Sequence, residues 1–106
     1  MKPSPNLLDE LVRRIVEAVH PLRIILFGSA ARGEMGPDSD LDVLVVMPDG
    51  VHRRNTTHEI YRCMWGFGFA KDVVVVTESD LREHGSDPSM VIKSALEEGT
   101  ILYHAA

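Results

Sequence analysis

The sequence contains a single cysteine, Cys63, among 106 residues. A lone cysteine cannot form an intramolecular disulfide bond, and it argues against a cysteine-based zinc site. Basic residues are also in the minority, since 11 Lys and Arg stand against 16 Asp and Glu and give a formal net charge of -5. This balance argues against the sequence-independent attraction to phosphate backbones on which nucleic-acid-binding proteins depend, so nucleic acid is not an expected partner.

Long apolar runs are missing as well. No run approaches the roughly 20 residues that a membrane-spanning helix requires, and the N-terminus MKPSPNLLDE lacks the apolar core of a signal peptide. We therefore expect no membrane association and a cytoplasmic location. The chain is long enough for one domain, residues 1–106, with a modest core, and its content of 44% hydrophobic and 25% charged residues is ordinary for a globular protein. A homo-oligomer is left open.

Apolar periodicity and turn residues together predict an α/β (α+β) fold. Short apolar runs bounded by Pro, Gly or Asp predict strands at 23–27, 41–47, 72–76 and 100–104. Apolar residues at helical spacing and capping residues predict helices from residue 7 to near Pro21, at 29–34, at 51–66, after Thr77, and from Asp87 to Gly99. These elements predict a small mixed sheet with flanking helices.

The connections between these strands predict how they pair. Only a short excursion separates 23–27 from 41–47, which favours an antiparallel pair. A helix-sized crossover joins 41–47 to 72–76, which favours a parallel pair. Both strands of the parallel pair would then begin at the same end of the sheet. Three carboxylates are expected to come together there, beside the turn that follows residue 27: Asp40, Asp42 and Asp72.

Residues 28–42, GSAARGEMGPDSDLD, carry the strongest functional signal. Asp40 and Asp42 are spaced i, i+2 on a strand, so they project from the same side with Cα atoms roughly 6.5–7 Å apart. Two unit charges about 4 Å apart repel by about 4 kcal/mol at an effective dielectric constant of ~20. No Lys or Arg lies within four residues of Asp42, and oxygen-only ligands at a polyphosphate site favour Mg²⁺. The alternative interpretation is a turn cap followed by a solvated strand end.

The residues that precede the acidic pair are suited to a phosphate group. Gly28 lets the backbone approach a phosphate closely, and Ser29 offers a hydroxyl at the start of a helical turn. Arg32 lies three residues later on the same face. Alternatively, Gly28 and Ser29 form an ordinary turn, and Arg32 is a surface residue that pairs with Glu34 or Glu10.

The pattern G-S-x-x-R-G, then S-D-x-D, then a third Asp that opens a later strand, resembles the DNA polymerase beta-type nucleotidyltransferase superfamily. Within it the chain is most similar to the minimal nucleotidyltransferases (MNT). The resemblance runs from strand 23–27 to the terminal EEGTILYH, and no core motif position departs from it: Gly28, Ser29, Arg32, Gly33, Ser39, Asp40, Asp42 and Asp72.

The resemblance implies a polymerase beta-like nucleotidyltransferase fold and transfer of a nucleoside monophosphate from a nucleoside triphosphate, most simply AMP from ATP. Gly28 and Ser29 would hold the β- and γ-phosphates, and Arg32 and Ser39 belong to the same nucleotide-binding set. Two Mg²⁺ ions would be held by Asp40, Asp42 and Asp72. Asp72 would also assist deprotonation of the attacking hydroxyl.

For the acceptor, the resemblance implies a HEPN-domain toxin, on which the MNT protein acts as antitoxin by attaching AMP to a tyrosine. Two other interpretations stay open. One is a non-catalytic antitoxin that silences its partner by binding alone, and the other is a transferase for a small-molecule hydroxyl such as that of an aminoglycoside. Three aspartates that repel one another argue against pure binding.

Other chemistry-bearing residues give weaker signals. The five histidines are scattered and do not predict a zinc site. The cluster 52–54 (HRR) is interpreted as a solvated helix face. Trp65, Phe67 and Phe69 are expected to pack in the core, and Cys63 is expected to be a buried apolar residue.

Overall fold

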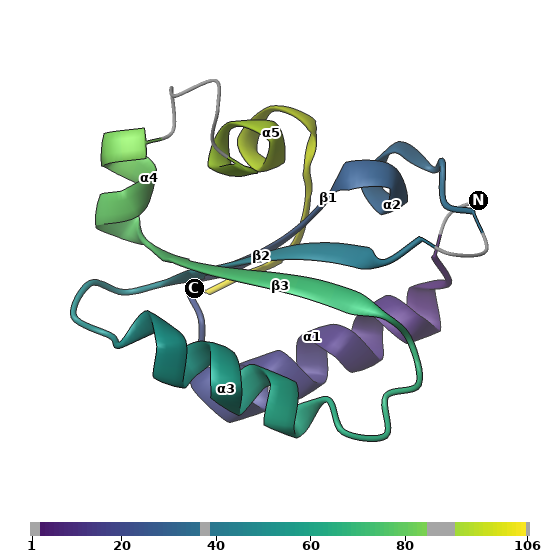
Figure 1. The fold of residues 1–106 in the computed structure, drawn as a ribbon, viewed down its shortest axis with the longest axis horizontal. Helices are drawn as coiled ribbons and strands as arrows, with labels where there is room; N and C mark the ends of the chain where they lie inside the picture. The colour runs from purple at the N-terminus through teal and green to yellow at the C-terminus, as the bar shows by residue number, and fades with distance from the viewer. Residues whose placement is uncertain (1–2, 37–38, 85–90, 106) are drawn as a thin grey trace.

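The computed structural model describes residues 3–36, 39–84 and 91–105, which form a four-stranded sheet with helices on both faces (Figure 1). The first helix, α1 (Pro5–Val19), begins after Ser4, whose Oγ accepts a hydrogen bond from the backbone N–H of Leu7 at 3.1 Å. The chain then continues through β1 (Arg23–Phe27), α2 (Gly28–Arg32), β2 (Leu41–Met47), α3 (Arg53–Cys63), β3 (Lys71–Thr77), α4 (Glu78–His84), α5 (Val91–Glu98) and β4 (Thr100–His104).

The predicted strands are confirmed, and β3 is one residue longer at each end than expected. The helix predicted at 51–66 is shorter, because α3 ends at Cys63. The chain reverses after it through Gly66 and Gly68, whose φ values of 79° and 80° are incompatible with a continued helix. The helix start predicted at Asp87 lies outside the described residues.

The sheet has the strand order β3-β2-β1-β4. β1 pairs with β2 and with β4 in antiparallel fashion, whereas β2 and β3 are parallel. The pairing predicted for the first three strands is therefore confirmed. β2 lies in the interior of the sheet, and six of its seven residues are buried.

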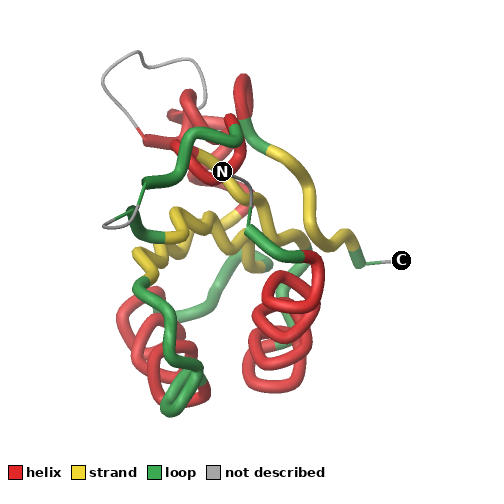
Figure 2. Tube along the Cα trace, turned by 90° about the vertical axis from the view of Figure 1, so that its right-hand side faces the viewer, coloured by secondary structure: helices red, strands yellow, loops and turns green. Residues whose placement is uncertain are grey.

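The two faces of the sheet carry separate apolar clusters. One cluster packs beneath α1 and α3, where Leu11, Ile15 and Ile60 contact alternate residues of the strands. The other lies on the opposite face, where Ile92 and Ala95 of α5 cover Leu44 and Val46. Figure 2 shows the resulting three layers, with α1 and α3 side by side on one side of the sheet. No helix among the described residues is long and apolar enough to cross a membrane.

Candidate functional site

Two of the three predicted aspartates lie side by side at one end of the sheet. Asp42 of β2 and Asp72 of β3 are register partners in the parallel pair, so their Cα atoms are about 4.8 Å apart. Leu44 and Val74, two positions after Asp42 and Asp72 in their strands, belong to the apolar cluster that α5 covers. The two side chains therefore share the face on which α2 and α5 lie.

Asp40 lies close enough to Asp42 for their charges to interact. The pKa of Asp42 is raised above its ordinary value, first by burial, then by the negative charge of Asp72 and then by that of Asp40. Arg32 acts in the opposite direction and is the favourable charge of this group. Asp40 and Asp72 are exposed, while Asp42 is half-buried. A cation beside Asp42 would therefore offset its burial and the charges of its two neighbours.

Within residues 3–36, 39–84 and 91–105, the three carboxylates of Asp40, Asp42 and Asp72 have no hydrogen-bond donor. The structure also does not close them into a cage, because no three His, Cys, Asp or Glu side chains of the described residues are arranged to hold one ion. Two adjacent oxygen donors and an open side fit Mg²⁺, which takes one or two protein carboxylates and keeps water or phosphate as its other ligands.

The turn at Gly28 lies directly against Asp42. Gly28 has a φ of 69°, and a Cβ atom built on it would overlap with Oδ2 of Asp42. Glycine is therefore required here on two counts, a left-handed backbone and a close approach. The hydroxyl of Ser29 makes no hydrogen bond within the described part of the chain. The predicted phosphate turn thus lies beside Asp42, and its role in binding phosphate stays a prediction.

Replacing Gly28 should consequently destabilise the fold as well as affect ligand binding. Gly66 is the matched control, because its φ is 79° and a Cβ atom added there would meet nothing within 4 Å. Both Gly→Ala variants carry the left-handed penalty of roughly 1–2 kcal/mol. We expect Gly28→Ala to cost at least about 1 kcal/mol more, through displacement of Asp42, which thermal unfolding would register as a Tm roughly 4–8 °C lower. Equal melting temperatures would contradict the close contact.

Arg32 is engaged with two carboxylates of the protein. Its Nε atom lies 3.4 Å from Oε2 of Glu34, and its Nη1 atom lies 3.2 Å from Oε2 of Glu98. Glu34 is one of the two surface partners considered from the sequence. The other, Glu10, pairs with arginines of its own helix instead. The contact of Arg32 with phosphate stays a prediction.

Ser39 shapes the turn that leads into β2. Its Oγ accepts a hydrogen bond from the backbone N–H of Gly36 at 2.9 Å, and its own N–H donates to the carbonyl oxygen of Gly36 at 3.2 Å. These bonds fix the backbone immediately before Asp40. A contact between Ser39 and nucleotide likewise stays a prediction.

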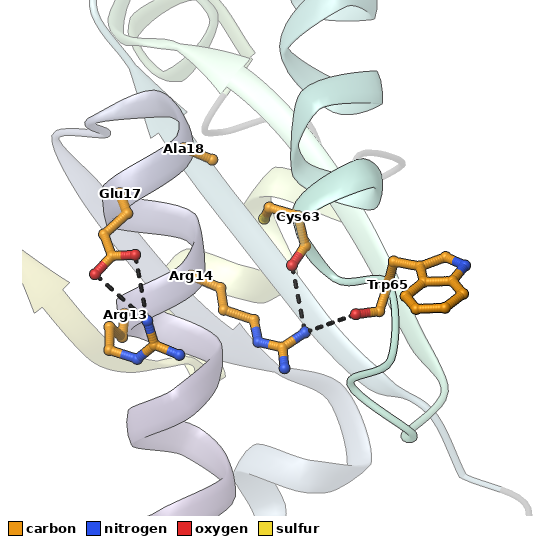
Figure 3. Close-up of a pocket in the computed structure, with 6 residues that line it drawn as sticks. All are labelled: Arg13, Arg14, Glu17, Ala18, Cys63 and Trp65. Atoms are coloured by element: carbon orange, nitrogen blue, oxygen red, sulfur yellow. Dashed lines mark hydrogen bonds and ion pairs between the residues drawn. The ribbon is translucent and has the colours of Figure 1, made fainter.

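The expectation that Trp65 packs in the core is wrong. Its side chain is 89% exposed, because the chain turns immediately after α3 and carries the indole away from α1, as Figure 3 shows. Phe67 and Phe69 do pack against the core. Cys63 is half-buried.

Beside Trp65, a groove of about 410 Å³ runs between α1 and the end of α3. Arg14 closes one wall, because its Nη1 atom donates to the carbonyl oxygens of Cys63 and Trp65 at 3.3 and 3.1 Å (Figure 3). Six residues line the groove, and none of them is a predicted site residue: Arg13, Arg14, Glu17, Ala18, Cys63 and Trp65. The groove is therefore separate from the acidic site.

Sequence reasoning missed one contact next to Asp72. The hydroxyl of Tyr61 accepts a hydrogen bond from the backbone N–H of Val73 at 3.0 Å. This bond attaches the outer edge of β3 to α3 one residue beyond Asp72. No periodicity or spacing in the sequence links Tyr61 to this strand.

Comparison with known proteins assigns the domain to a family. The family model of the nucleotidyltransferase domain matches residues 8–102. The chain belongs to this family. A curated member of similar sequence is the bifunctional uridylyltransferase/uridylyl-removing enzyme of Burkholderia thailandensis, which is 33% identical over 84 residues. The match covers 76% of this chain and 10% of that enzyme, so the chain spans about a tenth of the length of the relative.

Chains of several solved structures have a similar fold. A Sulfolobus solfataricus protein described as a nucleotidyltransferase matches with a TM-score of 0.64 at 19% identity, covering 93% of this chain and 78% of its own. A chain of a toxin–antitoxin structure with AMP-PNP matches with a TM-score of 0.60 at 20% identity, covering 92% and 73%. A chain from the complex of a tri-AMPylated Shewanella oneidensis HEPN toxin with an MNT antitoxin matches with a TM-score of 0.55 at 15% identity, covering 94% and 71%.

Proposed function

We propose that this protein is a Mg²⁺-dependent nucleotidyltransferase that moves a nucleoside monophosphate, AMP from ATP, onto a hydroxyl acceptor. One observation carries the proposal. In a domain of the nucleotidyltransferase family, Asp42 and Asp72 are register partners, and the backbone of Gly28 lies against the Asp42 carboxylate. Acid pair and phosphate turn are therefore within reach of one metal-bound triphosphate.

Each residue of the site has a distinct task in this proposal. Asp40, Asp42 and Asp72 would hold the two Mg²⁺ ions, which would neutralise charge on the phosphates. Gly28 and Ser29, with Arg32 and Ser39 nearby, bind and orient the triphosphate. The acceptor oxygen attacks the α-phosphorus, the bond to the β-phosphate bridging oxygen breaks, and pyrophosphate leaves. Asp72 takes the proton from the acceptor hydroxyl.

We propose a tyrosine of a HEPN-domain toxin as the acceptor, so that transfer makes this protein an antitoxin in the cytoplasm. The support comes from the similarity in fold to the complex of a tri-AMPylated HEPN toxin with an MNT antitoxin. The exposed positions of Asp40 and Asp72 also leave the reacting end of the site open to a large acceptor. The uridylyltransferase relative makes UTP the donor to test against ATP.

The test is a transfer assay with the purified protein, Mg²⁺, and ATP or UTP labelled at the α-phosphate. The acceptor is a purified HEPN-domain toxin, and a parallel reaction contains an aminoglycoside. Label on a toxin tyrosine, dependent on Mg²⁺ and on Asp72, would support protein adenylylation. Label on the small molecule alone would favour that alternative. Silencing of the toxin without label on any acceptor would favour an antitoxin that acts by binding.

A further inference from the structure

Arg32 is the favourable charge of the acidic site, yet two protein carboxylates occupy its guanidinium. Its charge lowers the pKa of Asp42, so the guanidinium lies within electrostatic range of the acid pair. The pKa of Arg32 itself is raised by its bonds to Glu34 and Glu98. Any phosphate that reaches Arg32 must therefore displace a carboxylate or share the guanidinium with it.

The two carboxylates differ in how they are held. Glu34 is two residues from Arg32 in the chain and follows the same turn, which Gly33 forms in the left-handed conformation with a φ of 72°. Glu98 belongs to a different element, as the last residue of α5. Its bond to Arg32 spans 66 positions in the sequence and joins α2 to α5.

The end of α5 that carries Glu98 is fixed in place. The backbone N–H of Gly99 donates to the carbonyl oxygen of Ala95 at 2.9 Å. A Cβ atom on Gly99 would overlap with that oxygen and with Cγ2 of Ile25 in β1. Because Gly99 is packed tightly against β1, the end of α5 has little room to move away from Arg32. Release of Arg32 would require its side chain to move away from Glu98.

We propose that Glu98 sets the affinity of the site for nucleotide, because it competes with the phosphates for Arg32. This inference rests on the proposed function. Without nucleotide, the Glu98 carboxylate holds the guanidinium at the α2–α5 junction. When the triphosphate binds, Arg32 exchanges Glu98 for a phosphate oxygen. The cost of breaking the ion pair is subtracted from the binding free energy.

The variant that tests this exchange is Glu98→Gln, which keeps the size of the side chain and removes its charge. Calorimetric titration with Mg-ATP should give an affinity about three- to fivefold higher than that of the parent, the range expected for an exposed ion pair. Glu97→Gln is the matched control, because Glu97 is the neighbouring residue and pairs with Lys93 of its own helix at 3.6 Å. It should leave the affinity unchanged.

A second background separates competition from simple charge repulsion. In an Arg32→Gln variant, the gain from Glu98→Gln should disappear, because no guanidinium remains to be released. A gain that persists without Arg32, or that Glu97→Gln reproduces, would overturn the inference in favour of general repulsion. Weaker binding by Glu98→Gln would also overturn it, since Glu98 would then position Arg32 for the ligand. Glu98→Ala repeats the measurement should Glu98→Gln unfold.

The proposed function and the role of Glu98 fail in distinguishable ways. Equal affinities of the parent and Glu98→Gln for Mg-ATP would overturn the inference and leave the proposed function standing. Absence of Mg-ATP binding to the parent protein would overturn the proposed function and the inference with it.

Discussion

Asp72→Asn is expected to lower nucleotidyl transfer by about 10²-fold or more while most of the affinity for Mg-ATP is retained. The amide keeps the size of the side chain but cannot take the proton of the acceptor hydroxyl, and loss of acid–base assistance costs about 10²–10⁴-fold. Such a loss acts on the transition state more than on the bound substrate. The affinity for Mg-ATP is also expected to persist because Asp72→Asn removes one of the negative charges that repel Asp42.

The measurement follows labelled AMP transfer and the activity of the partner toxin in the same reaction. Asp9→Asn, at an exposed carboxylate of α1, is the control for a general loss of charge. Transfer at the parental rate by Asp72→Asn would remove Asp72 from the mechanism. Full silencing by both proteins without transfer would make this protein a binding module that has retained the site.

The strand framework is predictable because it follows from local sequence. β2 is an apolar run in the sheet interior, and Asp42 is its only residue that is not buried. The parallel direction of β2 and β3 follows from the crossover between them, so the placement of Asp72 at the same end of the sheet as Asp42 is within reach of sequence reasoning, whereas the exact register comes from the structure. Gly28 is predicted from the sequence for close approach of its backbone to a phosphate, which stays a prediction, whereas its φ of 69° and its contact with Asp42 emerge only from the structure.

Contacts between side chains distant in the chain are not predictable in this way. Nothing in the local pattern links Arg32 to Glu98, because the bond depends on how α2 and α5 pack on one face of the sheet. The exposure of Trp65 escapes prediction for a related reason. The sequence favours a helix that continues to residue 66, whereas α3 ends at Cys63 and the indole follows a turn. Convergence of the three aspartates is predicted from strand order, but mutual repulsion of their charges opposes a closed arrangement.

Replacing both Asp40 and Asp42 with Asn is expected to weaken Mg-ATP binding at least tenfold, about 1.4 kcal/mol. The amides keep the shape of the side chains and remove the charge that Mg²⁺ neutralises. Calorimetric titration with and without Mg²⁺ measures the effect, with circular dichroism to establish that the fold is intact. Affinity equal to that of the parent would show that these carboxylates do not hold the metal.

The same double variant should be more stable than the parent when no metal is present. Burial and the neighbouring carboxylates raise the pKa of Asp42 in the folded state, so the folded protein holds this proton more tightly than the unfolded chain does. The free energy of unfolding therefore falls as the pH rises from about 3.9, the usual Asp value, to the higher pKa of Asp42 in the folded state. The penalty grows as the pH rises above the usual Asp value, and Asn removes it. In EDTA at pH 7 we expect a higher Tm for the variant than for the parent, and this difference should shrink below about pH 4.

Mg-ATP should raise the Tm of the parent and leave that of the variant nearly unchanged. A variant less stable than the parent in EDTA would mean that the two carboxylates support the fold, and their charge could then not be assigned to metal binding.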